Sequence, residues 1–181
     1  DLSQSRGLGD VYKRQPVNMG VDKDTLSGWL ADYDHDKITI GVVASHSSLQ
    51  ILHGARKEGF RTLGIAVGEN RRKFYQAFPG ADPDEWLMLE DYREMLDYAE
   101  WFRKRNVVII PHGSLVEYLG STNFRSLQVP TFGNRGILHW ESSRARQREW
   151  LENGGCDMPK VLDDPHEIDG PVIVKYAGAK G

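Results

Sequence analysis

Short runs of β-branched and aliphatic residues alternate along the chain with segments whose apolar residues recur at helical spacing. The apolar runs predict buried strands at residues 37–45, 61–67, 86–89 and 106–111. The intervening segments predict helices at residues 22–33, 47–59, 71–78 and 91–105. This alternation predicts an α/β fold, a Rossmann-like doubly wound parallel sheet with right-handed crossovers. Ligands of such sheets bind in the crevice beyond the carboxyl ends of the strands.

The pattern changes after the fourth predicted strand. Residues 135–153 have helical spacing but carry many charges, and two glycines follow them. An Asp-Gly turn then precedes a further apolar run, which predicts a strand at residues 171–176. We therefore place a domain boundary near Gly154, with one domain at residues 16–153 and the start of a second at residues 154–181.

The first fifteen residues are polar and are excluded from the fold. The stretch SRGLGDVYKRQ, at residues 5–15, back-translates without strain into a string that resembles the transposase adapter used in sequencing libraries. We therefore interpret residues 1–15 as an adapter-derived tail, and segments of this kind are set aside before fold is inferred. A natural disordered tail is the alternative.

Composition and charge make some classes of function less favoured for this protein. The 181 residues are 39% hydrophobic and 27% charged, which is enough apolar material for a sizeable core. A formal net charge of −3 favours neither a nucleic-acid nor a membrane partner, and no apolar run reaches the length of a membrane span. Cys156 is the single cysteine and has no partner for an internal disulfide, which favours a reducing, cytoplasmic compartment.

The first candidate site follows the first predicted strand. Ser45, His46 and Ser47 lie where the strand ends and a helix begins. Free backbone N–H groups at such a helix start, with hydroxyls beside them, suit a phosphate or carboxylate, and His46 can donate a hydrogen bond. Simple capping of the helix by Ser45 or Ser47 is an equally good interpretation of the spacing alone.

The second candidate site repeats this chemistry at the end of the fourth predicted strand. His112, Gly113 and Ser114 again combine a histidine, a small residue and a hydroxyl at a helix start. Two such sets at matching strand ends are expected to face one crevice. The histidines lack the closely spaced partners of a zinc site, and the chain has no GxSxG elbow and no GxGxxG fingerprint, which disfavours metal, hydrolase and dinucleotide sites.

Two later segments carry further candidates for binding anions. Arg135 follows a Phe-Gly-Asn turn and is able to position an anion, although a solvated arginine at a helix start is the simpler interpretation. Lys175 ends the last apolar run beside a loop that contains Gly178, Lys180 and Gly181. A lysine charge and close backbone N–H groups suit a polyphosphate, whereas an edge strand running into a turn is the alternative.

Taken together, four segments resemble one family of enzymes. They read ITIGVVASHSSLQILHGARKEGF, VVIIPHGSLVEYLG, VPTFGNRGILHWES and DGPVIVKYAGAKG. Their succession resembles the archaeal-type, formate-dependent 5-formaminoimidazole-4-carboxamide ribonucleotide synthetases, which are purine-synthesis ligases of the ATP-grasp superfamily. The match runs from about Thr25 to Gly181. It departs from the family at Tyr176-Ala177, where an aromatic residue followed by proline is expected.

This resemblance implies a reaction, a pre-ATP-grasp domain and a set of ligands. Formate, ATP and the aminoimidazole carboxamide ribonucleotide (AICAR) would give the formylated ribonucleotide (FAICAR), ADP and phosphate through formyl phosphate. Mg²⁺ would accompany ATP, with its carboxylate ligands beyond residue 181 and no metal ligand within the chain. Self-assembly into a homo-oligomer is also implied. Residues 154–181 would be the truncated start of the ATP-grasp domain, so the chain alone is expected to be inactive.

The resemblance also carries residue roles. His46 and Ser114 match family positions that contact AICAR. Lys175 matches the ATP-contacting lysine, and residues 178–181 match the start of the flexible nucleotide loop. His112 lies in a family motif, as does Arg135, without a defined role.

Two other functions stay open from the sequence. A paralogue of the same architecture would act on a different amine or ribonucleotide, because fold and partial motifs do not fix a substrate. The second alternative is a nucleotide-binding module without catalytic activity.

Overall fold

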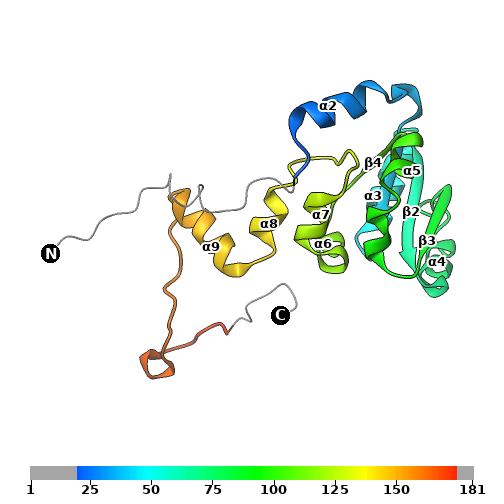
Figure 1. The fold of residues 1–181 in the computed structure, drawn as a ribbon. Helices are drawn as coiled ribbons and strands as arrows, with labels where there is room; N and C mark the ends of the chain where they lie inside the picture. Colours follow the sequence, from blue (N-terminus) through cyan, green and yellow to red (C-terminus); the bar gives the residue numbers. More distant parts are fainter. Residues whose placement is uncertain (1–19, 175–181) are drawn as a thin grey trace.

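A four-stranded parallel sheet forms the centre of the computed structural model, which describes residues 20–174 (Figure 1). The strands are β1 (Thr39–Val43), β2 (Arg61–Val67), β3 (Glu85–Leu89) and β4 (Val107–Ile109). Their order is β3-β2-β1-β4, and every neighbouring pair is parallel. The four predicted strands and the predicted α/β fold with a parallel sheet are confirmed.

Helices cover both faces of the sheet. On one face, α3 (Ser48–Lys57) and α4 (Glu69–Gln76) bury Leu52 and Tyr75 against Val42 and its neighbours. The other face carries the larger core, to which η2 (Tyr92–Leu96), α5 (Ala99–Lys104), α6 (Gly113–Leu119) and α7 (Ser121–Ser126) contribute. Successive strand residues serve opposite faces, so adjacent valines of β1 belong to different clusters.

The remaining helices frame this core. An N-terminal helix α2 (Lys23–Ala31) is capped by Asp22, whose side chain accepts a hydrogen bond from the Thr25 backbone N–H. A short turn η1 (His35–Lys37) leads from it into β1. Tyr33, between the two, is buried and donates a hydrogen bond to the Val107 carbonyl oxygen at 2.8 Å. The helix predicted at residues 22–33 is therefore present and is anchored to the start of β4.

Two predicted helices are each divided into two. Residues 91–105 form the 3₁₀ turn η2, which begins at an Asp91–Glu94 capping box, and then the separate helix α5. Residues 135–153 form α8 (Ile137–Glu141) and α9 (Arg144–Asn153), with the Ser143 side chain capping the second. Ser143 is a side-chain cap inside the predicted helix, whereas α5 begins after Tyr98 without a side-chain cap hydrogen bond. Periodicity reveals neither break.

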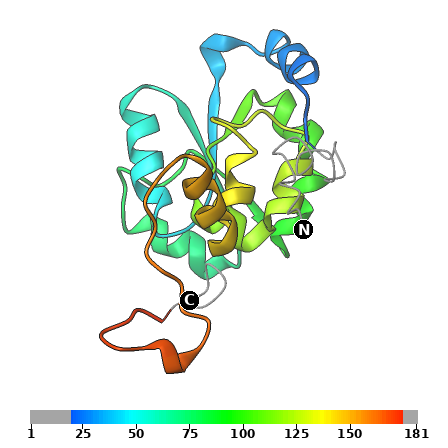
Figure 2. The ribbon, with the colours of Figure 1, turned by 90° about the vertical axis from the view of Figure 1, so that its left-hand side faces the viewer.

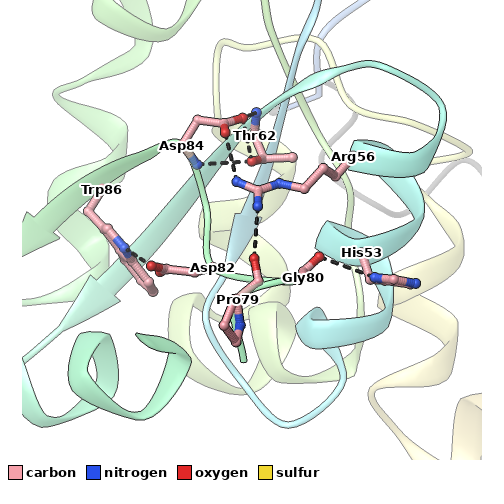
Figure 3. A network of polar contacts seen from close by, with 8 residues as sticks. All are labelled: His53, Arg56, Thr62, Pro79, Gly80, Asp82, Asp84 and Trp86. Atoms are coloured by element: carbon pink, nitrogen blue, oxygen red, sulfur yellow. Dashed lines mark hydrogen bonds and ion pairs between the residues drawn. The ribbon is translucent and has the colours of Figure 1, made fainter. Parts of the chain in front are cut away.

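A polar network fixes the amino-terminal end of the sheet, opposite the carboxyl ends of the strands (Figure 3). Asp84 Oδ2 accepts hydrogen bonds from the backbone N–H and the hydroxyl of Thr62 at 2.9 and 2.8 Å. Arg56 donates to Asp84 Oδ1 at 2.8 Å and to the Pro79 carbonyl oxygen at 2.9 Å. The network joins α3, the start of β2 and the segment that leads into β3.

Residues 154–174 leave the packed layers, as Figure 1 and Figure 2 show from two directions. This segment contains only the short turn η3 (Pro165–Glu167). Residues 171–174 form no strand in the described chain, so the strand predicted at 171–176 is wrong over that stretch, and its last two residues lie outside the described range. A strand needs a hydrogen-bonding neighbour, and Ile173 and Val174 remain 83% and 84% exposed. The boundary near Gly154 stays a prediction.

Candidate functional site

Sheet topology brings the two His/Ser segments to one place. The chain steps outward from β1 to β3 and then returns to the other side of β1 as β4. The reversal puts a topological switch point between β1 and β4, where open α/β sheets bind ligands. Ser45 and His46 follow β1, and His112 to Ser114 follow β4. The two candidate segments thus flank the switch point.

Buried hydroxyls hold the turn between β1 and α3. Ser48 Oγ accepts a hydrogen bond from the Ser45 backbone N–H at 2.6 Å and lies 2.7 Å from the Tyr75 hydroxyl oxygen. Tyr75 in turn donates to the Ser45 carbonyl oxygen, and burial raises the pKa of its phenol. Ser47 takes the N-cap position of α3 but makes no side-chain cap hydrogen bond. The turn is therefore fixed by Ser48 and Tyr75, while His46 stays exposed.

The second segment is tied directly to the first. His112 Nε2 donates to the Val43 carbonyl oxygen at 3.0 Å, which joins the end of β4 to the end of β1. Burial lowers the pKa of His112, and the nearby His46 lowers it further, against a smaller opposing effect of that hydrogen bond. His112 is therefore neutral at pH 7, with its proton on Nε2. Its Nδ1 is buried without a hydrogen-bond partner among residues 20–174.

The first turn of α6 presents the remaining residues of this segment. Gly113 opens the helix, and the Ser114 side chain is 8% exposed. Within the described chain the Ser114 hydroxyl has no hydrogen-bond partner, so its donor is available to a ligand. Sequence reasoning placed both histidines and Ser114 at strand ends, and the structure brings these ends together.

A cleft of about 650 Å³ opens beside this point, between the ends of β1 and β2. Ser45 and His46 line one side of it. The other side is lined by the end of β2, the turn after it and the first half of α4, namely Val67, Gly68, Glu69, Asn70, Arg71 and Phe74. His112 and Ser114 are not among the lining residues, so His46 is the group that connects the cleft with the switch point.

Sequence reasoning missed the contribution of the β2–α4 turn. Gly68 has φ 80°, a conformation that favours glycine and turns the chain from β2 into α4 beside the cleft. The available signal was positional, because this Gly-Glu-Asn-Arg run also follows a predicted strand. It lacks the His/Ser chemistry that drew attention to the other two strand ends.

Arg135 has a structural role in the described chain. Its guanidinium donates to the backbone carbonyl oxygens of Leu127 and Val129, near the end of α7, and lies over the Phe124 ring. Burial lowers the pKa of Arg135 to about 10. The suggestion that Arg135 positions an anion of the substrate stays a prediction.

The expected nucleotide-binding residues lie outside the described range. These are Lys175, Gly178, Lys180 and Gly181. Among residues 20–174, His, Cys, Asp and Glu side chains form no group of three able to hold a metal ion. No helix of that same stretch has the length and apolarity to cross a membrane.

Comparisons with known proteins identify the relatives of this chain. The family described as "Protein of unknown function (DUF1246)" matches residues 40–162. The 5-formaminoimidazole-4-carboxamide-1-(beta)-D-ribofuranosyl 5'-monophosphate synthetase 1 of Methanosarcina mazei is 57% identical over 161 residues, which are 89% of this chain and 45% of the relative. The synthetase of the same name from Archaeoglobus fulgidus is 47% identical over 165 residues, 90% of this chain and 45% of the relative. The chain thus spans about half the length of the curated relatives that it matches.

Solved structures give the same picture of the fold. The IMP biosynthesis protein PurP from Thermococcus kodakaraensis is 35% identical with a TM-score of 0.59, over 72% of this chain and 41% of that chain. N5-carboxyaminoimidazole synthetase from Staphylococcus aureus has a TM-score of 0.52 at 15% identity, over 66% of this chain and 31% of that chain, and shows a shared fold alone. The family resemblance inferred from the sequence motifs is confirmed. The chain belongs to the DUF1246 family, and its relatives are named as 5-formaminoimidazole-4-carboxamide ribonucleotide synthetases.

Proposed function

We propose that the full-length protein is an ATP-dependent ligase that formylates AICAR with formate to give FAICAR, ADP and phosphate. One observation carries this proposal: residues 45–46 and 112–114 meet at the switch point of the sheet, in a chain 57% identical to a named synthetase of this product. In this proposal the described domain binds the ribonucleotide. His46 and Ser114 hold it, with Ser45, Ser47, His112 and Gly113 forming the surrounding turns.

The proposed chemistry explains why a ligase needs such a binding domain. Formate is a poor acyl donor until ATP phosphorylates it, which gives formyl phosphate and ADP. The AICAR amine then attacks the formyl carbon, the C–O bond to phosphate breaks, and the nitrogen loses a proton. Catalysis of this kind depends on holding the amine beside the reactive carbon. The exposed imidazole of His46 and the free hydroxyl of Ser114 supply polar contacts for that purpose.

The nucleotide half of the site is a separate part of the proposal. ATP supplies the phosphoryl group when bound, and Lys175 with the loop at residues 178–181 would contact it. We place the ligands of Mg²⁺ beyond residue 181, as the family resemblance implies. Cytoplasmic residence and a homo-oligomeric state remain expectations from composition and resemblance.

A turnover assay of the full-length protein tests the reaction. We expect ADP to be released only when formate, ATP and AICAR are all present, with FAICAR formed in equal amount. Omission of formate is the matched control, because a simple ATPase would continue without it. Release of ADP that does not depend on formate or on AICAR would contradict the proposal.

A further inference from the structure

One arginine in the cleft has no ion-pair or hydrogen-bond partner in the part of the chain that the structure describes. Arg71 lines the cleft together with Ser45 and His46. Its guanidinium forms no ion pair and no hydrogen bond with any residue from 20 to 174. In contrast, the neighbouring Arg72 forms an ion pair with Glu69 at 3.6 Å. Arg71 therefore brings an uncompensated positive charge to this wall of the cleft.

The charge of Arg71 acts on the same turn that carries His46. Burial raises the pKa of Tyr75 and of Tyr92, and in both phenols the positive charge of Arg71 opposes this rise. The Tyr75 hydroxyl is the group that donates to the Ser45 carbonyl oxygen. Arg71 is thus within electrostatic reach of the β1–α3 turn, and an anion held there would lie beside His46.

The rest of the cleft fits a nucleoside monophosphate. Phe74 is 49% exposed and forms an apolar wall with Val67, which suits the flat face of a base. Asn70 and His46 offer hydrogen bonds, and the Glu69 carboxylate is turned to its own partner, Arg72. Among the described lining residues, an arginine without a partner beside an aromatic wall matches a ligand with both a planar ring and a phosphate.

We propose that Arg71 anchors the 5′-phosphate of the ribonucleotide substrate. This inference rests on the proposed function and adds a specificity-determining residue to its site. The planar guanidinium fork binds two phosphate oxygens at once, which a lysine ammonium does not reproduce. Arg71 then distinguishes a ribonucleotide from the corresponding nucleoside.

Calorimetric titration of the 181-residue chain with AICAR and with its riboside, which lacks the phosphate, tests this role. We expect the parent chain to bind AICAR more tightly than the riboside. Arg71→Gln should weaken AICAR binding by about ten- to a hundredfold, the range for a lost charge-assisted hydrogen bond. The affinity of Arg71→Gln for the riboside should equal that of the parent. The AICAR affinity of Arg71→Lys should lie between those of the parent and Arg71→Gln. Lys73→Gln, which removes an exposed charge of the same sign from α4, should bind like the parent.

The outcomes separate this inference from the proposed function. If the parent binds AICAR and Arg71→Gln binds it equally well, the anchor is wrong while the substrate assignment stands. An equal loss of AICAR and riboside affinity would also overturn the anchor, because it would indicate a general structural effect. A parent chain that binds no AICAR would overturn both. The thermal unfolding midpoint of each variant should match the parent, since Arg71 has no partner among the described residues.

Discussion

At the residue scale, the geometry of the cleft depends on groups that never face the ligand. Ser48 and Tyr75 are fully buried and fix the backbone on which His46 stands. His46 itself was predictable from its place at a strand end. Ser48 and Tyr75 were not, because their contact joins residues 27 positions apart, and local pattern carries no signal for such pairs. The same holds for Arg71, whose proposed role depends on its having no partner among residues 20–174.

Asp84 gives a stability prediction at this scale. Burial raises the pKa of Asp84, but hydrogen bonds from Thr62 and Arg56 outweigh it and hold the pKa below its usual value. A carboxylate of this kind stabilises the fold above its unfolded pKa, about 3.9, and the stabilisation is lost as pH falls through its folded pKa. We expect Asp84→Asn to lower the free energy of unfolding by about 1 kcal/mol near pH 7, a value reduced for solvent screening.

Urea unfolding at several pH values measures this effect. The difference between the parent and Asp84→Asn should shrink below about pH 4, where the parent carboxylate takes up its proton. Asp157→Asn, a change at an exposed position beyond α9, should leave the free energy of unfolding unchanged. A difference between Asp84→Asn and the parent that is constant from pH 7 to pH 3 would contradict the ionised network of Figure 3.

At the element scale, apolar runs located the four strands because buried parallel strands are apolar on both faces. The helices were located less well. New helices begin after Tyr98 and Ser143, each within a continuous apolar stripe, so periodicity predicted which residues are buried but not where the helices break. The glycines inside strands also needed the structure. Gly64 pairs in register with Trp86, whose ring lies over it.

Gly64 supplies the prediction at this scale. A Cβ at Gly64 would lie 2.6 Å from the Pro83 side chain and 2.7 Å from the Trp86 ring. Gly64→Ala should therefore lower the free energy of unfolding by about 1–3 kcal/mol, the usual cost of overpacking. Gly54→Ala is the matched control, because a Cβ there meets no atom within 4 Å, and α3 should gain about 0.5–1 kcal/mol. Denaturant unfolding measures the free energy of unfolding of Gly64→Ala and Gly54→Ala. Equal changes of the same sign in both variants would contradict the packing of β2 against β3.

At the scale of the whole molecule, the chain has a packed core and, after it, a segment that does not pack against the core. Helices α3 to α7 pack on the sheet and α8 and α9 lie to one side of it, whereas residues 154–174 extend away with several apolar side chains exposed (Figure 1). The predicted strand at residues 171–176 depended on an apolar run alone. A strand also requires a neighbouring backbone, and none of the described segments supplies one. In the proposed function the ribonucleotide binds to the described domain and ATP binds outside it.

We propose that His46 and Ser114 jointly hold the ribonucleotide at the switch point of the sheet. The most direct test is calorimetric titration with AICAR of the parent chain and of a variant in which both residues are changed to alanine. We predict that His46→Ala/Ser114→Ala weakens AICAR binding at least about tenfold, as expected when two hydrogen bonds are lost. The control His166→Ala/Ser121→Ala should bind like the parent, since both changes lie away from the strand ends. An AICAR dissociation constant that is the same in the parent and in His46→Ala/Ser114→Ala would contradict the account.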